Sequence, residues 1–311
     1  VRYLEWLDRA RIIKEASTIH GHPSESIPPI LAVGERQHST GQEIITVIVS
    51  AYELLARFSD SINSVEGNRT LNKLGWKHEM RAPYIVALVV GRLLGLSEEQ
   101  MANALAIAGC FTVPLGILEQ GEYEVTMARN ILFSYGAYNG ILGALLAQKG
   151  FKGPLNIFEG HHGFAEVVDR GKIDLGKLTQ RRSDWTILNT WIKGIAADST
   201  LHAHLEGTLN LVMEHDIRPE NVAEVKIKIN AHVYGRMAKP SGRRYPKNME
   251  TAVHSSYYAT AVAILDRAVG IDQFSDETRL QDPKVRELSD KVFVEPDPTL
   301  EESNSPGIVE I

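Results

Sequence analysis

Two histidines beside prolines are the first residues in this chain that could carry out acid/base chemistry. His20 and His22 lie in the stretch IHGHPSESIPPIL, residues 19–31, where Pro23 and two later prolines stiffen the backbone. Proline fixes its own φ and restricts the residue before it, so Pro23 is expected to hold His22 in an extended conformation. A histidine held in this way serves either as a structural joint or as a positioned proton donor or acceptor.

A second group of titratable residues occurs in GWKHEMR, residues 75–81, just before an apolar stretch. Lys77, His78 and Arg81 would lie near the start of the helix that this stretch predicts. Cations at a helix N-terminus oppose the helix dipole unless an anion also lies there. The segment is therefore either an anion-binding turn or a solvated basic turn.

Two further places combine polar residues with structural punctuation: NTWIKG with the following DSTLHAH, and HSSYYAT, whose adjacent Tyr257 and Tyr258 are expected in the core. Lys193 stands in the apolar frame TWIKG, where a lysine is either a surface residue or a positioned ammonium. His202 and His204 are two residues apart and would face different sides of a helix, so they cannot jointly bind one metal ion from there. The sequence GHHG, residues 160–163, lacks a second spaced pair of ligands and indicates a loop, so no metal site is predicted.

The composition limits the class of protein. The chain has 311 residues, of which 43% are hydrophobic and 23% are charged, and its formal net charge is -6. These values are ordinary for a soluble globular protein and allow two domains. The negative charge argues against nucleic acid or an anionic membrane surface as a partner, so an anionic substrate would need a local cluster of cations. The longest apolar run, residues 82–96, contains Arg92 and is too short to span a bilayer.

The single cysteine, Cys110, excludes an internal disulfide and a cysteine-held iron–sulfur cluster. It follows ANALAIAG and is expected to be a small buried residue. The single cysteine and the lack of a recognisable secretory signal favour the cytoplasm, or the mitochondrial matrix in a eukaryote. Because the chain begins VRYLEWLD and finishes SPGIVEI, it is expected to be a fragment of a longer chain or a shortened relative.

Hydrophobic periodicity predicts a helical first part of the chain. The predicted helices cover residues 41–58, 82–96, 97–109 and 127–150. The third opens on a capping box formed by Ser97 and Gln100. The many glycines and alanines of the fourth indicate closely packed helices.

The sequence pattern changes after about residue 153, where long apolar helical periodicity gives way to turn-forming residues. Residues 153–172 are rich in turn formers and predict a linker. Val225, Ile227 and Ile229 alternate with polar residues, as expected of a half-buried strand. The other elements predicted here are helices over 199–215, 249–269 and 282–292 and strands over 291–295 and near 307–311. We therefore expect a mostly α protein with a smaller α+β part, in which a helical domain over 1–188 precedes an α+β domain over 189–311.

Taken in order, these segments resemble the MmgE/PrpD family, which includes 2-methylcitrate dehydratases, cis-aconitate decarboxylases and iminodisuccinate epimerases. The resemblance rests on VRYLEWLD, HPSESIPPILAVGE, GWKHEMRAP, RLLGLSEEQMANALAIAG, FEGHHGF, TWIKGIAAD, HSSYYATAVAILD and DPKVRELSDKVFVE. It covers almost the whole chain, across the middle of a longer family chain. It implies a large helical domain truncated at its N-terminus, an α+β lid truncated at its C-terminus, a homodimer, and an active site between the domains.

The resemblance also implies site residues. The two family histidines correspond to His22 and His78, the lysine before an FPA-type segment corresponds to Lys193, and the lid tyrosine corresponds to Tyr258. A family lysine in the glycine-rich helix corresponds to Arg129.

Two other segments depart from the family pattern. The LDFNDT-like segment reads LEWLDR, which keeps acidic residues at Glu5 and Asp8 but has Arg9 in place of threonine. Where the decarboxylases have a histidine after FPA, this chain has Asp198. The expected substrate-binding residues are Arg129, Tyr258, Glu5, Asp8 and His202.

The predicted function is a lyase without a cofactor that dehydrates 2-methylcitrate or a close tricarboxylate. Removing a proton beside a carboxylate creates an enediolate-like charge, which cations stabilise. Histidine is suited to take that proton and to help hydroxide leave. His22, His78 and Lys193 are the expected catalytic residues, and no metal is predicted.

Two alternatives stay open. The first is another reaction of the family, cis-aconitate decarboxylation or iminodisuccinate epimerisation, which shares the initial carbanion-type step. The second is a catalytically degenerate relative that acts through dimer or partner contacts. Arg9 and Arg129 favour the second alternative, because arginine keeps its charge at neutral pH and does not donate a proton.

Overall fold

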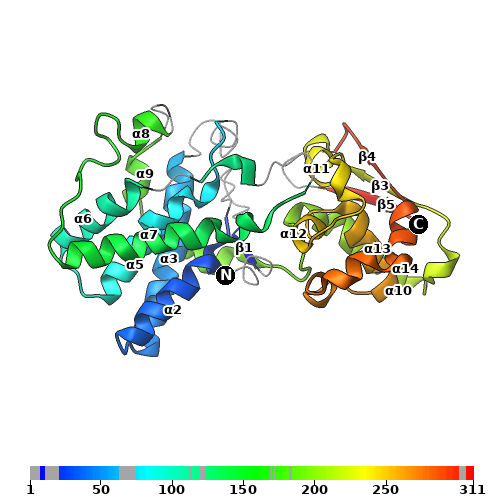
Figure 1. The fold of residues 1–311 in the computed structure, drawn as a ribbon, viewed down its shortest axis with the longest axis horizontal. Helices are drawn as coiled ribbons and strands as arrows, with labels where there is room; N and C mark the ends of the chain where they lie inside the picture. The colour runs from blue at the N-terminus through cyan, green and yellow to red at the C-terminus, as the bar shows by residue number, and fades with distance from the viewer. Residues whose placement is uncertain are drawn as a thin grey trace. The chain divides into compact units, whose positions relative to one another are not determined.

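The computed structural model of the chain forms two compact units (Figure 1). It describes residues 8–10, 21–62, 74–111, 114–118, 124–168, 170, 173–181, 184–300 and 306–311. Unit 1 comprises Val1–Ile117 and Asn130–Ile192, and unit 2 comprises Leu118–Arg129 and Lys193–Ile311. The segment Leu118–Arg129 thus groups with unit 2, and the expected domain boundary at residue 188 stays a prediction.

Unit 1 is built mainly from helices, as its hydrophobic periodicity predicts. Its α-helices are α2 (Ile27–Arg36), α3 (Gly41–Ile62), α5 (Ala82–Leu93), α6 (Glu98–Gly109), α7 (Leu132–Gln148), α8 (Phe164–Val167) and α9 (Gly176–Thr179). The short 3-10 helices are η1 (Pro23–Ser26), η2 (His78–Arg81), η3 (Gly116–Leu118), η4 (Met127–Ile131) and η5 (Thr186–Asn189). Of these, η3 ends in unit 2 and η4 begins in unit 2. Two short strands, β1 (Asp8–Ala10) and β2 (Thr190–Ile192), pair antiparallel.

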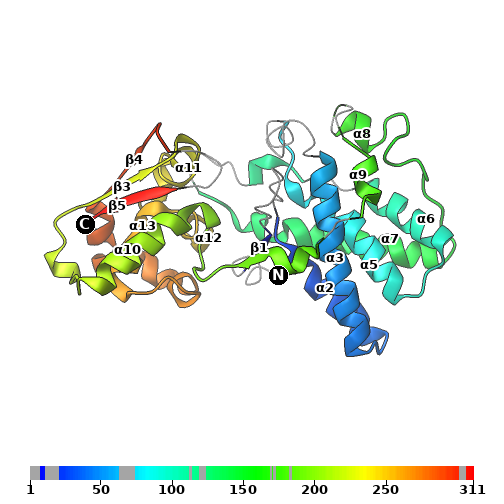
Figure 2. The same ribbon diagram turned by 180° about the vertical axis from the view of Figure 1, so that it is seen from behind.

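Glycines allow α7 to lie close against α5 and α6, and the three helices run side by side in Figures 1 and 2. A Cβ added at Gly140 would lie 2.8 Å from both the Pro83 carbonyl oxygen and the Val86 Cβ. A Cβ added at Gly143 would lie 2.8 Å from the Ala104 carbonyl oxygen. The prediction that the small residues mark close helix packing is confirmed.

The predicted start of α6 is also confirmed. The Ser97 side chain accepts a hydrogen bond from the Gln100 backbone N–H, and the Gln100 side chain accepts one from the Ser97 backbone N–H. Two of the donors that a helix leaves unpaired at its N-terminus are therefore satisfied locally.

The described residues 153–168 belong to unit 1, so the prediction of a linker over 153–172 is wrong. Phe158 and Phe164 belong to an aromatic cluster of unit 1 with Phe58 and Tyr84, in which the ring centroids lie 5.0–5.9 Å apart. Phe164 is buried. The turn formers of this segment shape a loop that is anchored on a hydrophobic core, because aromatic rings bury large apolar areas.

Unit 2 combines a small sheet with helices. Its α-helices are α10 (His202–Glu214), α11 (Ala231–Met237), α12 (Met249–Ala252), α13 (Ser256–Asp266) and α14 (Pro283–Asp290). Its 3-10 helices are η6 (Ser199–Leu201), η7 (Pro219–Asn221), η8 (Ser241–Arg243), η9 (Asp272–Phe274) and η10 (Glu277–Gln281). The strands β3 (Val225–Ile229), β4 (Val292–Pro296) and β5 (Gly307–Glu310) form a sheet of order β4-β3-β5.

The central strand β3 has the alternation that its sequence predicts. Val225, Ile227 and Ile229 are at most 1% exposed, whereas Lys226 is exposed. The strand pairs parallel with β4 and antiparallel with β5, and α10 packs on β5. The mostly α architecture with a smaller α+β part is therefore confirmed.

Two local expectations differ from the structure. The single helix expected over residues 249–269 is interrupted between α12 and α13, because the Ser255 side chain caps α13 by accepting from the Tyr258 N–H. Cys110 is exposed rather than buried, since it lies just beyond the end of α6. No helix among the described residues is long and apolar enough to cross a membrane.

Replacing Gly140 with alanine should destabilise the protein. The new methyl group would overlap the backbone of α5, and such overpacking typically costs about 1–3 kcal/mol. Gly235→Ala in α11 is the matched control, because a Cβ there has open space around it and gains helix propensity. Urea unfolding should show a lower midpoint for Gly140→Ala and an unchanged or higher one for Gly235→Ala; equal midpoints would contradict the close packing of α7.

Candidate active site

His22 stands where the chain enters η1. Its φ of -117° and ψ of 90° are extended, so the conformation expected from the following Pro23 is confirmed. The His22 carbonyl oxygen accepts a hydrogen bond of 3.1 Å from the Glu25 N–H. Two prolines then fill the first turn of α2, where a missing N–H is tolerated. The backbone on the C-terminal side of His22 is therefore held firmly.

Unit 1 brings His78 close to His22. The two ring centroids are 6.3 Å apart, with an angle of 42° between the ring planes. Both residues line a small hollow together with Glu25, Glu79 and Arg81. Its volume is about 10 Å³, which is room for about one water molecule. This hollow is too small to enclose a tricarboxylate. A substrate of that size would therefore contact the two imidazoles from outside the hollow.

Buried charges surround the two imidazoles. The Arg81 Nε donates a hydrogen bond of 2.8 Å to the His78 carbonyl oxygen, and its guanidinium also donates to the Ser59 hydroxyl. Burial lowers the pKa of Arg81 to about 10, while the carboxylates of Glu79 and Glu25 oppose that shift. Arg81 therefore stays charged at neutral pH and fixes the backbone of His78 from inside the unit.

The alternative of a solvated basic turn at residues 75–81 is wrong, because Lys77 and Arg81 are 8% and 4% exposed. Acidic side chains of unit 1 itself provide negative charge here. The His78 Nε2 lies 3.2 Å from the Glu79 Oε1, and Glu79 is buried. The Glu79 carboxylate therefore lies within ion-pair distance of the His78 ring.

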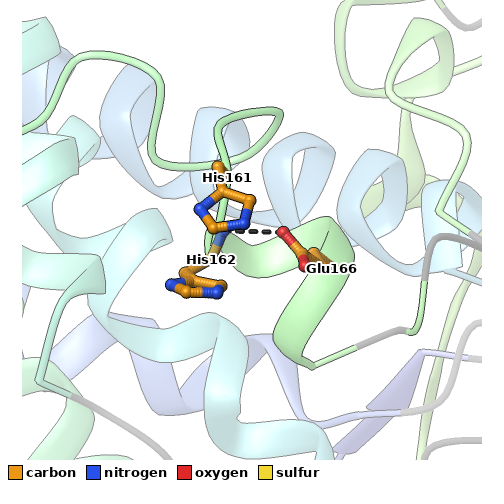
Figure 3. A group of neighbouring side chains, drawn as sticks. All are labelled: His161, His162 and Glu166. Atoms are coloured by element: carbon orange, nitrogen blue, oxygen red, sulfur yellow. Dashed lines mark hydrogen bonds between the residues drawn. The ribbon is translucent and has the colours of Figure 1, made fainter.

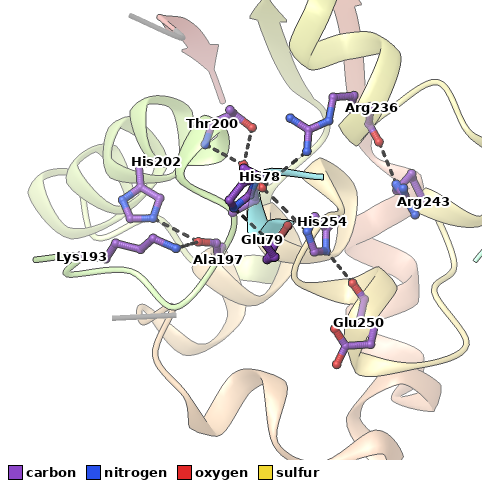
Figure 4. A network of polar contacts seen from close by, with 11 residues as sticks. His78, Glu79, Lys193, Ala197, Thr200, His202, Arg236, Arg243, Glu250 and His254 are labelled. Atoms are coloured by element: carbon purple, nitrogen blue, oxygen red, sulfur yellow. Dashed lines mark hydrogen bonds and ion pairs between the residues drawn. The ribbon is translucent and has the colours of Figure 1, made fainter. Parts of the chain in front are cut away.

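Unit 2 brings Lys193 and His202 together. The Lys193 Nζ donates to the Ala197 carbonyl oxygen at 3.3 Å, and the His202 Nε2 lies 3.3 Å from the same oxygen (Figure 4). Lys193 is 7% exposed and His202 is 3% exposed. Of the two alternatives for Lys193, a surface residue and a positioned ammonium, the structure supports the positioned ammonium.

A neighbouring group of unit 2 brings Asp198 into contact with residues that the sequence does not pair with it. The Asp198 Oδ1 accepts from the Thr200 N–H and hydroxyl at 2.9 and 2.7 Å, and so caps η6. The Asp198 Oδ2 lies 3.8 Å from the His254 Nε2 and 3.9 Å from an Arg236 nitrogen. His254 opens the polar segment HSSYYAT, and nothing in the sequence predicts that its imidazole lies beside Asp198.

Tyr258 lies in the core of unit 2. It is 1% exposed, packs against Phe274, and donates its hydroxyl to the Gln273 carbonyl oxygen at 2.7 Å. Burial raises the pKa of this phenol well above its usual range. Tyr258 thus has a clear structural role, and its role at a substrate stays a prediction.

For the other expected substrate-binding residues, Arg129, Asp8 and Glu5, the structure gives less information. The Arg129 side chain is buried in η4. The backbone of Asp8 pairs with that of Ile192, the residue before Lys193. Glu5 lies outside the described residues.

His204 is a second buried histidine of α10, two residues after His202. The sequence assigns it no role of its own. His204 is fully buried, and neither of its ring nitrogens has a hydrogen-bond partner among the described residues. Burial, together with the neighbouring His202, lowers the pKa of His204 to about 3. The ring therefore stays neutral, so His204 is suited to packing rather than proton transfer near neutral pH.

Two family models match the chain. The MmgE/PrpD N-terminal domain matches residues 12–175, and the MmgE/PrpD C-terminal domain matches residues 196–310.

Curated relatives match over most of the chain. A cis-aconitate decarboxylase of Aspergillus terreus is 26% identical over 286 residues, which cover 86% of this chain and 56% of that protein. A cis-aconitate decarboxylase-like protein of Aspergillus oryzae is 22% identical over 299 residues, covering 89% and 59%. A mitochondrial 2-methylcitrate dehydratase of Yarrowia lipolytica is 23% identical over 283 residues, covering 88% and 53%. The chain thus spans little more than half the length of these relatives.

His204 should make the protein less stable in acid. Its pKa of about 3 lies below the value of about 6.5 of a histidine in an unfolded chain. Between these values the unfolded state binds more protons, so the contribution present above pH 6.5 is lost as the pH falls toward 3. The slope is about 1.4 kcal/mol per pH unit.

Urea unfolding from pH 7.5 to 4 checks this expectation. In His204→Leu, the free energy of unfolding should depend less steeply on pH, by about one proton taken up on unfolding. His215→Leu is the matched control, because His215 is an exposed histidine at the C-terminal end of the same helix. A wild-type pH dependence in His204→Leu would show that the pKa of His204 is the same in the folded and unfolded states, and would contradict the expectation.

Proposed function

The chain belongs to the MmgE/PrpD family, and on this basis we propose that it is a cofactor-free lyase that dehydrates 2-methylcitrate or a close tricarboxylate. One observation carries the proposal. His22 and His78 come from different segments of unit 1, yet their rings lie 6.3 Å apart beside buried charges. Two imidazoles at this spacing can reach neighbouring positions of one small substrate.

The proposed reaction is an elimination that uses both imidazoles. One takes the proton from the carbon beside a carboxylate, and the electron pair of that C–H bond forms the new C=C bond. The bond from the adjacent carbon to the hydroxyl breaks, and the other imidazole protonates the departing oxygen to give water. This division of work is what general acid/base catalysis requires.

The proposed reaction also needs cations beside the substrate carboxylates. Enediolate-like charge develops on the substrate carboxylate as the proton leaves, and fixed cations stabilise it. We assign this role to Lys193, whose ammonium is buried and hydrogen-bonded, with Arg129 holding another carboxylate. His202 shares the Ala197 carbonyl with Lys193 and would help to orient the ammonium. Asp8, Glu5 and Tyr258 keep their proposed substrate-binding roles.

Dehydration is preferred over decarboxylation because of Asp198. In the resemblance to the decarboxylases, this position is a histidine, which could donate a proton. Here the Asp198 carboxylate caps η6 and lies beside His254 and Arg236, so it is held in a structural role. The similarity to the cis-aconitate decarboxylase of Aspergillus terreus nevertheless makes cis-aconitate decarboxylation the second candidate.

We also propose that the chain forms a homodimer in the cytoplasm, or in the mitochondrial matrix of a eukaryote. An exposed apolar row on η4 and α7 supports the dimer. It consists of Ile131, Tyr135, Tyr138 and Leu142, which are 39–61% exposed. Their spacing places them on one helix face, opposite the glycines that pack on α5 and α6. An exposed apolar row of this kind is typical of a protein interface.

Proton NMR of the purified protein with 2-methylcitrate, and separately with cis-aconitate, tests the function. A new vinyl signal from 2-methylcitrate is expected. His22→Ala and His78→Ala should each slow its appearance on the order of 100- to 10,000-fold, because a positioned acid or base contributes about that much. Lys193→Met should also slow it strongly. His38→Asn, at an exposed histidine of unit 1, should leave the rate unchanged.

Other outcomes would redirect the assignment. Itaconate-type signals from cis-aconitate would replace dehydration with decarboxylation. Two silent samples of folded protein would favour the degenerate relative. Full activity in both His22→Ala and His78→Ala would show that the two imidazoles are not the catalytic pair.

Replacing Tyr138 with glutamate should dissociate the proposed homodimer, because a charge buried in an apolar interface is strongly unfavourable. Sedimentation or light scattering should show wild-type dimers and Tyr138→Glu monomers. Tyr245→Glu is the matched control, since this tyrosine is also exposed but lies in unit 2 and bonds to Asp290. A wild-type monomer would contradict the proposal.

A further inference from the structure

The sequence GHHG, which predicts only a loop, forms part of a compact side-chain cluster in the structure. The rings of His161 and His162 have centroids 3.7 Å apart, with their planes tilted by 34°. Glu166 follows in α8, and its carboxylate faces both rings (Figure 3). Potential ligand atoms of all three residues lie within 4.8 Å of one another, and all three side chains are exposed.

The backbone beneath this cluster is tightly folded. The Gly160 and Gly163 N–H groups donate hydrogen bonds of 2.7 Å to the carbonyls of Asn156 and Gly160. A Cβ at Gly160 would lie 2.6 Å from the Asn156 carbonyl oxygen, and one at Gly163 would lie 2.7 Å from the Ile157 carbonyl oxygen. Both glycines are therefore required for this turn, which brings the two histidines to the start of α8.

The turn is also anchored at both ends. Phe158 and Phe164, which flank it, belong to the aromatic cluster of unit 1. The Phe164 N–H donates to the Ile157 carbonyl oxygen at 2.8 Å, and the Ala165 N–H donates to the Phe158 carbonyl oxygen at 2.9 Å. The exposed imidazoles thus stand on a base fixed by core packing, which limits the entropy lost when they bind a ligand.

Glu166 is oriented toward the histidines by the backbone. Its Oε2 accepts a hydrogen bond of 2.7 Å from the His162 N–H. This bond lowers the pKa of the Glu166 carboxyl and outweighs the opposing effect of burial. The carboxylate therefore stays ionised near neutral pH. The φ of His162 is 60°, a left-handed conformation that turns its side chain to the same side as His161.

From this geometry we propose that His161, His162 and Glu166 form a surface site for one divalent transition-metal ion of the Zn²⁺ class. Two imidazole nitrogens and a carboxylate oxygen are ligands that this class of ion prefers, whereas Mg²⁺ and Ca²⁺ prefer oxygens alone. Tetrahedral ligands about 2.0 Å from zinc stand about 3.3 Å apart. The ligand atoms here lie within 4.8 Å of one another on exposed side chains, which can rotate to close to that spacing. Water would occupy the fourth position.

Isothermal titration of the full chain with ZnCl₂, without an added histidine tag, tests the proposal. One ion per chain is expected to bind, and MgCl₂ is expected not to bind. Two-dimensional NMR of the imidazole nitrogens should show that sub-stoichiometric Zn²⁺ shifts the signals of His161 and His162 first. Binding should weaken on acidification, because protons compete with the metal for the imidazoles.

The variants His161→Gln, His162→Asn and Glu166→Gln should each weaken the binding of Zn²⁺ about tenfold or more. Asparagine tolerates the left-handed backbone at position 162, and glutamine at 166 can still accept the His162 N–H, so both should fold. His38→Asn is the matched control, since His38 is exposed and has a φ of 55°. Wild-type affinity in all three site variants, equal binding of Mg²⁺, or imidazole shifts only at other histidines would overturn the proposal.

Discussion

The Arg81 guanidinium lies buried within unit 1, and the geometry of the two candidate catalytic histidines depends on how that charge is satisfied. Its Nε holds the His78 carbonyl, and the Ser59 hydroxyl on α3 accepts from the same group. Glu79 and Glu25 supply the opposing charge. A Cβ at position 21 would lie 2.8 Å from the Arg81 Nη2. Because Gly21 has no side chain, the segment that carries His22 can approach the guanidinium. Removing one partner from such a network leaves a buried charge uncompensated.

Local signals in the sequence were sufficient for most of the fold. The alternation in β3, the capping box of α6 and the small residues of α7 each reflect an interaction between near neighbours or a repeated pattern, so their effect is readable from the chain alone. The loop after residue 153 was misread as a linker for the opposite reason. Its turn formers are visible in the sequence, but its packing on Phe58 and Tyr84 depends on residues about 70 to 100 positions away.

The candidate site shows the same division. His22 and His78 were identified from prolines and from the family resemblance, and the structure places them together. No local pattern showed that Arg81 is buried, or that Lys193 and His202 share the Ala197 carbonyl. The sequence around His161 lacks a second spaced pair of ligands and therefore does not predict this cluster. Glu166 supplies the third ligand from the following helix, at a spacing that only the fold of the turn brings within reach.

A double-mutant cycle at His22 and His78 tests the central claim, that the two imidazoles act as one unit on the same substrate. The quantity to measure is kcat/KM for whichever of 2-methylcitrate and cis-aconitate is turned over, in the wild type, the two alanine variants and the double variant. Groups that act in one step lose little more when both are removed than when one is. If the two imidazoles do so, the double variant should be about as active as the weaker single variant. Losses that multiply across the cycle would show two independent contributions and would contradict the central claim.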